Sequence, residues 1–169
     1  MSGASADIVR RLTELERQVA EMKRMTRPYT AVRTRVYSSS PISVPSGPTS
    51  IALSFDTVRY DTAAMFDVTD PTRLTCQVAG LYALGGGIRW QTNGAGLRQM
   101  ALVLNGGTNM AIQKQNANAA EPGAMTLVTM YELAVGDYIE LFARQSSGGP
   151  LNIEAANAYS PEFWATRIV

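Results

Sequence analysis

The first hydrophobic pattern along the chain is helical. From residue 8 to residue 22, apolar side chains recur at spacings of four, three, four and three, at Ile8, Leu12, Leu15, Val19 and Met22. This is a heptad pattern, with Leu12 and Val19 at positions a and the other three at positions d. It predicts a helix over residues 6–25, with Ser5 or Asp7 as the N-cap and with Pro28 ending it.

So narrow an apolar stripe favours association of several helices, because an isolated helix of this length is marginally stable in water. Residues 11–16 also resemble the trimer-specifying pattern of short coiled coils. In that pattern Arg11, at position g, covers the edge of the core and pairs with Glu16, at position e, of the neighbouring chain. We therefore expect a three-stranded stalk. The alternative is an amphipathic helix that packs against its own domain.

Beyond Pro28 the pattern alternates with a period of two. Residues 29–37 place Val32, Thr34 and Val36 on one face, as expected of a half-buried strand. Residues 38–50 are rich in Ser, Pro and Gly and predict a loop. Further short strands are expected between Gly-rich turns, at residues 50–55, 74–78, 81–90, 100–104, 110–115, 125–133, 138–144, 151–153 and 163–168.

Many short strands with no further helical period indicate a β-sandwich or jelly roll. Its core is expected to consist of the apolar residues of these strands, namely Leu81, Leu84, Ile88, Leu102, Leu104, Leu127, Ile139 and Leu141. Tyr82 and Trp90 are placed on the opposite face of the central strand, near a threefold axis or the second sheet.

The amino-acid composition excludes fewer classes of function than the pattern of apolar and polar residues does. Charged residues make up 17% of the chain and the net charge is +1, which gives no argument for nucleic-acid binding. The single cysteine, Cys76, excludes an intrachain disulfide and is expected to be a small buried side chain.

Basic residues are in excess in and just after the helix. We expect them to make interhelical pairs or to contact an acidic docking surface, through Arg10, Arg17, Lys23, Arg24 and Arg27.

The chain contains no histidine, so Ser–His and Cys–His nucleophiles and a Cys/His zinc site are excluded. There is no Gly-rich phosphate loop followed by lysine either. The remaining candidate site is a set of loop carboxylates, Asp56, Asp61, Asp67 and Asp70, whose spacing does not match an EF-hand and favours turn formation over calcium binding. We expect no enzymatic activity, no cofactor and no metal site.

Several segments together resemble one family. They are an opening hairpin at residues 55–61, a strand–Gly–x–Tyr element at residues 74–82, an Asn-Gly turn at 105–106, a Gly-Asp-initiated strand at 136–141 and a closing strand at 163–168. The resemblance is to the trimeric jelly roll of tumour necrosis factor and of the globular head of the first complement component, which has bacterial and bacteriophage relatives. It implies a homotrimer with a jelly-roll head at residues 29–169, carried on a coiled-coil stalk at residues 1–28.

A minimal coiled coil instead of a collagen-like stem resembles the phage and bacterial-surface relatives. The resemblance therefore implies a non-enzymatic virion protein on the particle surface, a fibre or capsid decoration. Its N-terminal segment would dock on a capsid or tail protein, and the absence of a visible signal peptide fits assembly in the host cytoplasm. The alternative is an adhesin whose loops at residues 93–98 and 116–123, small, polar and expected to be flexible, grip a host glycan or protein. A cytokine-like bacterial ligand is a third class.

Overall fold

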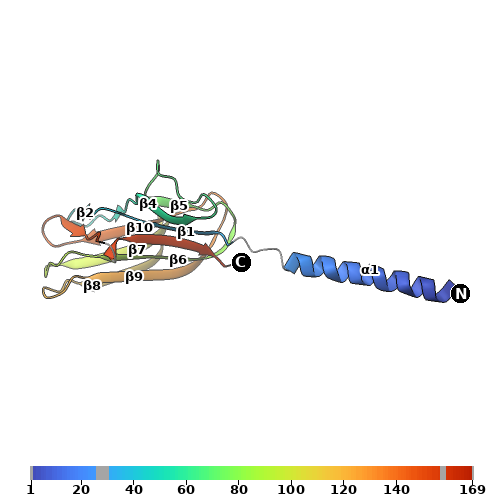
Figure 1. Cartoon of the computed structure of the whole chain (residues 1–169). Coiled ribbons are helices and arrows are strands. Elements are labelled where there is room, and N and C mark those ends of the chain that lie inside the picture. Colours follow the sequence, from blue (N-terminus) through green and yellow to red (C-terminus); the bar gives the residue numbers. More distant parts are fainter. Residues whose placement is uncertain (1, 26–30, 157–158, 169) are drawn as a thin grey trace. The chain divides into compact units, whose positions relative to one another are not determined.

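A computed structural model of the chain describes residues 2–25, 31–156 and 159–168, with the side chains of residues 2–6 and 23–25 excepted. The chain divides into two compact units, Met1–Thr30 and Ala31–Val169 (Figure 1). We call them the stalk unit and the head.

The stalk unit contains one helix, α1 (Ser2–Met25). It begins before the expected N-caps, so Ser5 and Asp7 lie inside it. Asp7 does not cap the helix but accepts a hydrogen bond of 3.0 Å from Arg10, one turn later. No helix in the described part of the chain is long and apolar enough to cross a membrane.

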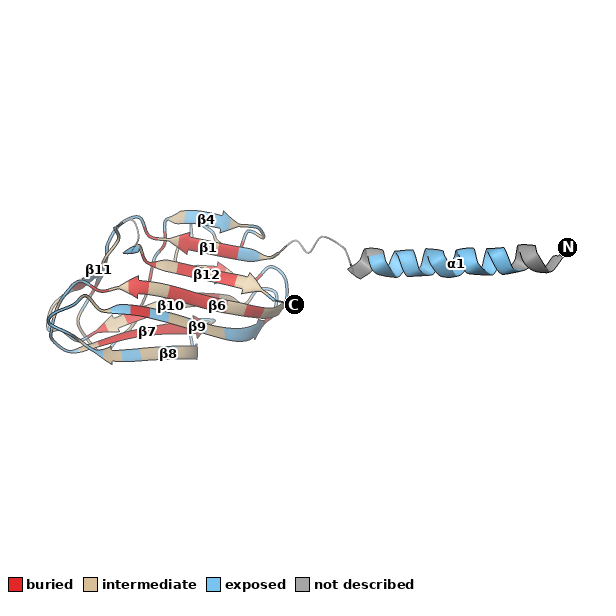
Figure 2. Ribbon diagram, turned by 60° about the horizontal axis from the view of Figure 1, so that its bottom comes forward, coloured by how far each residue is buried: buried red, intermediate tan, exposed pale blue. Residues whose placement is uncertain are grey.

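The head consists of two facing β-sheets (Figures 1 and 2). The first sheet has the order β4-β1-β12-β6-β9, with all neighbours antiparallel. Its strands are β1 (Arg33–Tyr37), β4 (Thr57–Asp61), β6 (Gly80–Arg89), β9 (Ala124–Leu133) and β12 (Glu162–Arg167).

The second sheet has the order β3-β10-β7-β8, and β5 also pairs with β10. Its strands are β3 (Ile51–Ala52), β5 (Arg73–Thr75), β7 (Leu97–Leu104), β8 (Thr108–Asn116) and β10 (Tyr138–Gln145). Two short strands, β2 (Ile42–Val44) and β11 (Leu151–Ile153), pair with each other as a third, two-stranded sheet. An all-β sandwich is therefore the architecture of the head.

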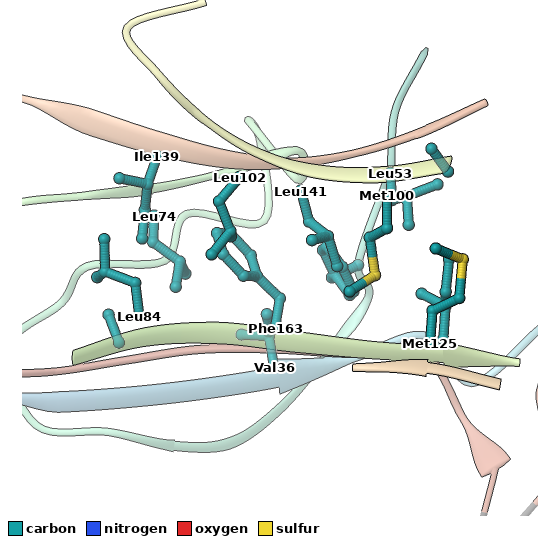
Figure 3. Close-up of a cluster of buried hydrophobic side chains, with 14 of the residues drawn as sticks. Val36, Leu53, Leu74, Leu84, Met100, Leu102, Met125, Ile139, Leu141 and Phe163 are labelled. Atoms are coloured by element: carbon teal, nitrogen blue, oxygen red, sulfur yellow. The ribbon is translucent and has the colours of Figure 1, made fainter. Parts of the chain in front are cut away.

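The core lies between the two large sheets, where apolar side chains from both layers meet (Figure 3). Five residues of the core expected from the sequence are buried there: Leu84, Ile88, Leu102, Ile139 and Leu141. Leu104 and Leu127 are partly buried and pack against this cluster.

The prediction that Tyr82 and Trp90 lie on the face of β6 opposite to the leucines and isoleucine of the core was wrong. Tyr82, Leu84, Ile88 and Trp90 lie on one side of the strand and are all buried, so Tyr82 and Trp90 face the second sheet together with the leucine and isoleucine. Leu81 is only half-buried and is not part of the core cluster. Side chains alternate along a strand, so residues 81 and 84 cannot share a face.

Several strand boundaries also differ from the expected ones. The segment predicted as a loop, residues 38–50, contains β2, which forms because Ile42–Val44 finds a partner in β11, more than a hundred residues away. The strands expected at 50–55 and 74–78 shorten to β3 and β5, and regular pairing in β1 starts only at Arg33. Residues 29–30 of that predicted strand lie outside the described residues.

Candidate functional site

The heptad seam of α1 is an exposed apolar surface. Its side chains retain between 42% and 66% of their accessible area, namely Ile8 (66%), Leu12 (56%), Leu15 (56%), Val19 (42%) and Met22 (56%). A stripe of large apolar residues left in water is characteristic of a helix that has partner helices.

The charged side chains of α1 pair with one another on the other side of the helix. Arg17, at position f, donates hydrogen bonds to Glu14 (2.8 and 3.0 Å) and to Glu21 (3.2 Å), both at positions c. Arg10, the preceding position f, pairs with Asp7 in the same way. The hydrogen bond from Arg17 lowers the pKa of Glu14. These intrahelical pairs compensate two of the cations expected to contact an acidic docking surface.

The other expected stalk contacts are placed as follows. Arg11 lies 3.6 Å from Asp7, a loose contact between exposed groups. Glu16 forms no ion pair or hydrogen bond within the described part of the helix, so its carboxylate is available to another chain. The side chains of Lys23 and Arg24, and Arg27 entirely, lie outside the described residues.

The head has a second candidate surface, the side of the first sheet that faces away from the core, which we call the outward face. Arg35, Trp164, Gly85 and Val128 lie opposite one another across β1, β12, β6 and β9. Val128 retains 57% of its accessible area, and Met130, two residues further along β9, retains 65%. Exposed apolar residues side by side on a sheet are a typical protein-contact surface.

The indole of Trp164 lies against the backbone of Gly85. A Cβ atom at Gly85 would stand 2.4 Å from Cζ2 of Trp164, so only glycine permits this approach. The run of three glycines at 85–87 is the sequence signal that could have indicated a close approach on this strand.

Beside the indole, Glu162 binds two arginines. Its Oε2 accepts a hydrogen bond of 2.8 Å from Nε of Arg35, and its Oε1 accepts one of 2.6 Å from Nε of Arg59. The guanidinium of Arg59 also lies 4.4 Å from the ring centre of Tyr37. The hydrogen bond to Glu162 raises the pKa of Arg35. The carboxylate thus joins β12 to its neighbour β1 and to the edge strand β4.

A shallow groove of about 620 Å³ opens on the outward face. The arginines of its lining are already compensated, since Glu162 binds Arg35 and Arg59, and Arg89 lies 3.1 Å from Glu154. Arg89 also packs 4.0 Å from the ring centre of Tyr159. Because these cations are paired, the groove is suited to a protein surface rather than to a free anion.

The two loops singled out from the sequence lie against each other. A Cβ atom at Gly94 would stand 2.6 Å from Cβ of Ala119, and the amide of Ala117 donates a 2.9 Å hydrogen bond to the carbonyl of Gly96. Loops 93–98 and 116–123 therefore form one surface.

The first of these loops is organised by Arg98, which was expected to lie in the loop but is a buried residue of β7, 2% exposed. Its guanidinium donates to the carbonyl oxygens of Asn93 and Ala95 (both 2.9 Å) and lies 5.7 Å from the ring centre of Trp90. Burial lowers the pKa of Arg98. A loop tied to a buried side chain in this way is not the flexible segment that its composition predicts.

The loop carboxylates act as turn formers. Asp61 accepts hydrogen bonds from the amides of Ala63, Met65 and Phe66, at 3.2, 3.1 and 2.9 Å. Asp67 accepts one of 2.8 Å from the amide of Thr69. Among the described residues no group of three potential metal-binding side chains comes together. Asp137, which was not among the candidate carboxylates, accepts a hydrogen bond of 2.9 Å from Nδ2 of Asn105 and so joins two loops.

No family model matches the chain, and no curated protein sequence matches it. Solved structures do match. The globular domain of a zebrafish complement 1qA protein superposes with a TM-score of 0.59 and 12% identity, covering 81% of this chain and 97% of that one. The Eiger TNF of S. frugiperda gives 0.61 and 12%, covering 82% and 93%.

Murine APRIL gives a TM-score of 0.62 at 8% identity, covering 82% of this chain and 99% of that one. None of these three is a bacteriophage protein. Identities this low establish the fold alone. The head is thus an all-β sandwich similar in fold to the globular domains of tumour necrosis factor and complement 1q proteins.

Proposed function

We propose that this chain is a homotrimeric, non-enzymatic structural module, in which three copies of α1 form a coiled-coil stalk and three heads associate through their outward faces. The observation that carries the proposal is the heptad seam, whose apolar side chains are exposed. The pairs of Arg10 with Asp7 and of Arg17 with Glu14 and Glu21 join positions c and f, away from this seam. This division is the one a coiled coil requires. The fold that the head shares with tumour necrosis factor supports the same assembly.

The direct test is the molecular mass of the purified protein assembly in solution. Sedimentation equilibrium of the full chain should give three times the mass of one chain. Leu15→Asp should weaken the trimer, because it would bring three carboxylates into one apolar layer of the stalk. Ala20→Asp is the matched control, since it adds the same charge at position b, outside the seam. A monomeric wild type, or equal effects of the two variants, would contradict the proposal.

We further propose that the module is a surface component of a virion, a bacteriophage fibre or capsid decoration anchored through the stalk unit. The stalk and head form separate compact units, which suits a division between attachment and display. Deletion of residues 1–27 should abolish incorporation into the particle while the head still folds. Normal incorporation of the truncated protein would reject the anchor.

The contact between loops 93–98 and 116–123 favours a second function, recognition of a host glycan or protein by the head. Two loops that form one surface, with the first organised by Arg98, supply the preordered backbone that recognition needs. Particles that carry Ala119→Arg should then adsorb to host cells more weakly than wild-type particles at equal incorporation. Unchanged adsorption would argue for a purely structural role.

A further inference from the structure

The ionic side chains of the first sheet are almost all compensated within the head. Glu162 binds Arg35 and Arg59, and Arg89 pairs with Glu154. Asp61 accepts several backbone hydrogen bonds, and Arg167 donates to the carbonyl of Ala79. Two exposed residues of this sheet, Arg33 and Glu132, form neither an ion pair nor a side-chain hydrogen bond within the described part of the chain.

These two charges lie at opposite sides of the outward face. Arg33 is on β1, next to the edge strand β4, and Glu132 is on β9, the strand at the other edge. Arg33, Thr166, Ala83 and Met130 lie opposite one another across the sheet. Glu132 is two residues beyond Met130, so it lies on the same face and about 7 Å further along the strands.

The surroundings of the two charges are also complementary. The guanidinium of Arg33 lies 5.3 Å from the ring centre of Tyr60, which is 38% exposed. Beside Glu132, the side chain of Met130 is 65% exposed. One side of the face thus presents a cation on an aromatic ring, and the other an anion next to a flexible apolar side chain.

A ring of identical chains brings different sides of one surface together, because each interface joins one edge of a copy to the other edge of the next. Rotation about a threefold axis that runs parallel to the strands does not move a residue along the strand direction. Arg33 of one copy then meets Met130 of the next and lies within reach of its Glu132. The geometry points to an intermolecular ion pair between Arg33 and Glu132, repeated once at each interface, that fixes which edges of the heads meet. This inference rests on the proposed trimer.

Charge reversal tests the pairing in the full chain. Arg33→Glu and Glu132→Arg should each raise the dissociation constant of the trimer by about tenfold or more at low ionic strength, and the double variant should restore most of the loss. Lys114→Glu is the matched control, because it reverses an exposed charge on β8 in the other sheet. A double variant that is no tighter than the weaker single variant would overturn the pairing.

Chemical cross-linking provides an independent measurement. In Arg33→Lys, carbodiimide should join the new amine to the carboxylate of Glu132 and produce covalent dimers and trimers that contain this peptide pair. Within one chain β1 and β9 are separated by β12 and β6, about 14 Å, so the cross-link cannot form intramolecularly. A trimer without this cross-link would overturn the ion pair but leave the proposed function intact, whereas a monomeric wild type would contradict the proposed function itself.

Discussion

Gly85 and Trp164 show how one residue shapes the outward face. The indole can lie on the sheet only because position 85 has no side chain, and the carbonyl oxygen of Leu127 stands 2.9 Å from where a Cβ would be. An added methyl group must therefore displace either the ring or the neighbouring strand. This makes the glycine a requirement of packing rather than of backbone conformation.

Gly85→Ala should accordingly lower the free energy of unfolding by about 1–3 kcal/mol, the usual cost of overpacking. Gly47→Ala is the control, because nothing lies within 4 Å of its Cβ position. Denaturant unfolding of the two variants and the wild type measures the difference. Equal stability of both variants would show that Trp164 can leave the glycine freely.

Asp137 provides a prediction about pH. Its carboxylate accepts hydrogen bonds from the side chain of Asn105 (2.9 Å) and from the amide of Ala134 (2.8 Å), and these contacts lower its pKa. A carboxyl group with a lowered pKa in the folded state stabilises the protein above its ordinary pKa, and this contribution disappears as the pH falls through the lowered value.

Asp137→Asn should therefore destabilise the head at neutral pH, by about 1 kcal/mol because the site is near the surface, and by much less in strong acid. The amide offers one acceptor oxygen in place of two, so it cannot accept from both Nδ2 of Asn105 and the amide of Ala134. Its NH2 group cannot donate to Oδ1 of Asn105 without competition, because that oxygen already accepts from the amide of Tyr138 at 2.9 Å. Unfolding curves of both proteins across the acidic range test the sign. A difference that stays constant with pH would contradict it.

At the scale of elements, the connection between β6 and β7 is held by a side chain of the strand that follows it. Arg98 donates hydrogen bonds to the carbonyl oxygens of Asn93 and Ala95, at 2.9 Å each, and so ties this connection to β7. The conformation of the loop thus depends on one buried guanidinium.

Arg98→Met should lower the free energy of unfolding by about 2–3 kcal/mol, because it removes the hydrogen bonds that a buried charged donor makes to the loop. It should also speed amide hydrogen exchange at residues 93–97 more than in the centre of β10. Arg144→Met is a useful control, since within the described residues Arg144 donates to one loop carbonyl, that of Gly47, at 3.0 Å. Uniform acceleration across the head would instead indicate global destabilisation.

At the scale of the whole molecule, the stalk unit and the head obtain their stability in different ways. Every residue of the core cluster lies in the head, between Val36 and Ala165. The described side chains of α1 are all exposed, so the helix gains no burial within its own unit. A helix of 24 residues without such burial is marginal in water.

The helical circular dichroism signal of the full chain should therefore fall on dilution while the β signal of the head persists. Residues 31–169 expressed alone should fold, with an unfolding midpoint close to that of the head in the full chain. If the head fails to fold without the stalk unit, or if helix and sheet are lost together at every concentration, the two units are not independent.

The amino-acid sequence by itself determined the features that depend on neighbouring residues. The spacing of Leu12, Leu15 and Val19 was sufficient to predict α1, and alternation was sufficient to predict that Ile139 and Leu141 lie on one face of β10. The order of the strand signals also carried the resemblance to the jelly roll whose fold the head shares.

Only the tertiary structure decided which side of β6 faces the core, since Leu81 and Tyr82 are both apolar and alternation alone does not choose between them. It also decided the pairing of β2 with β11, the burial of Arg98, and the position of Arg33 and Glu132 at opposite sides of one face. Each of these depends on contacts between segments far apart along the chain, and the local pattern at one segment carries no information about the segment that packs against it.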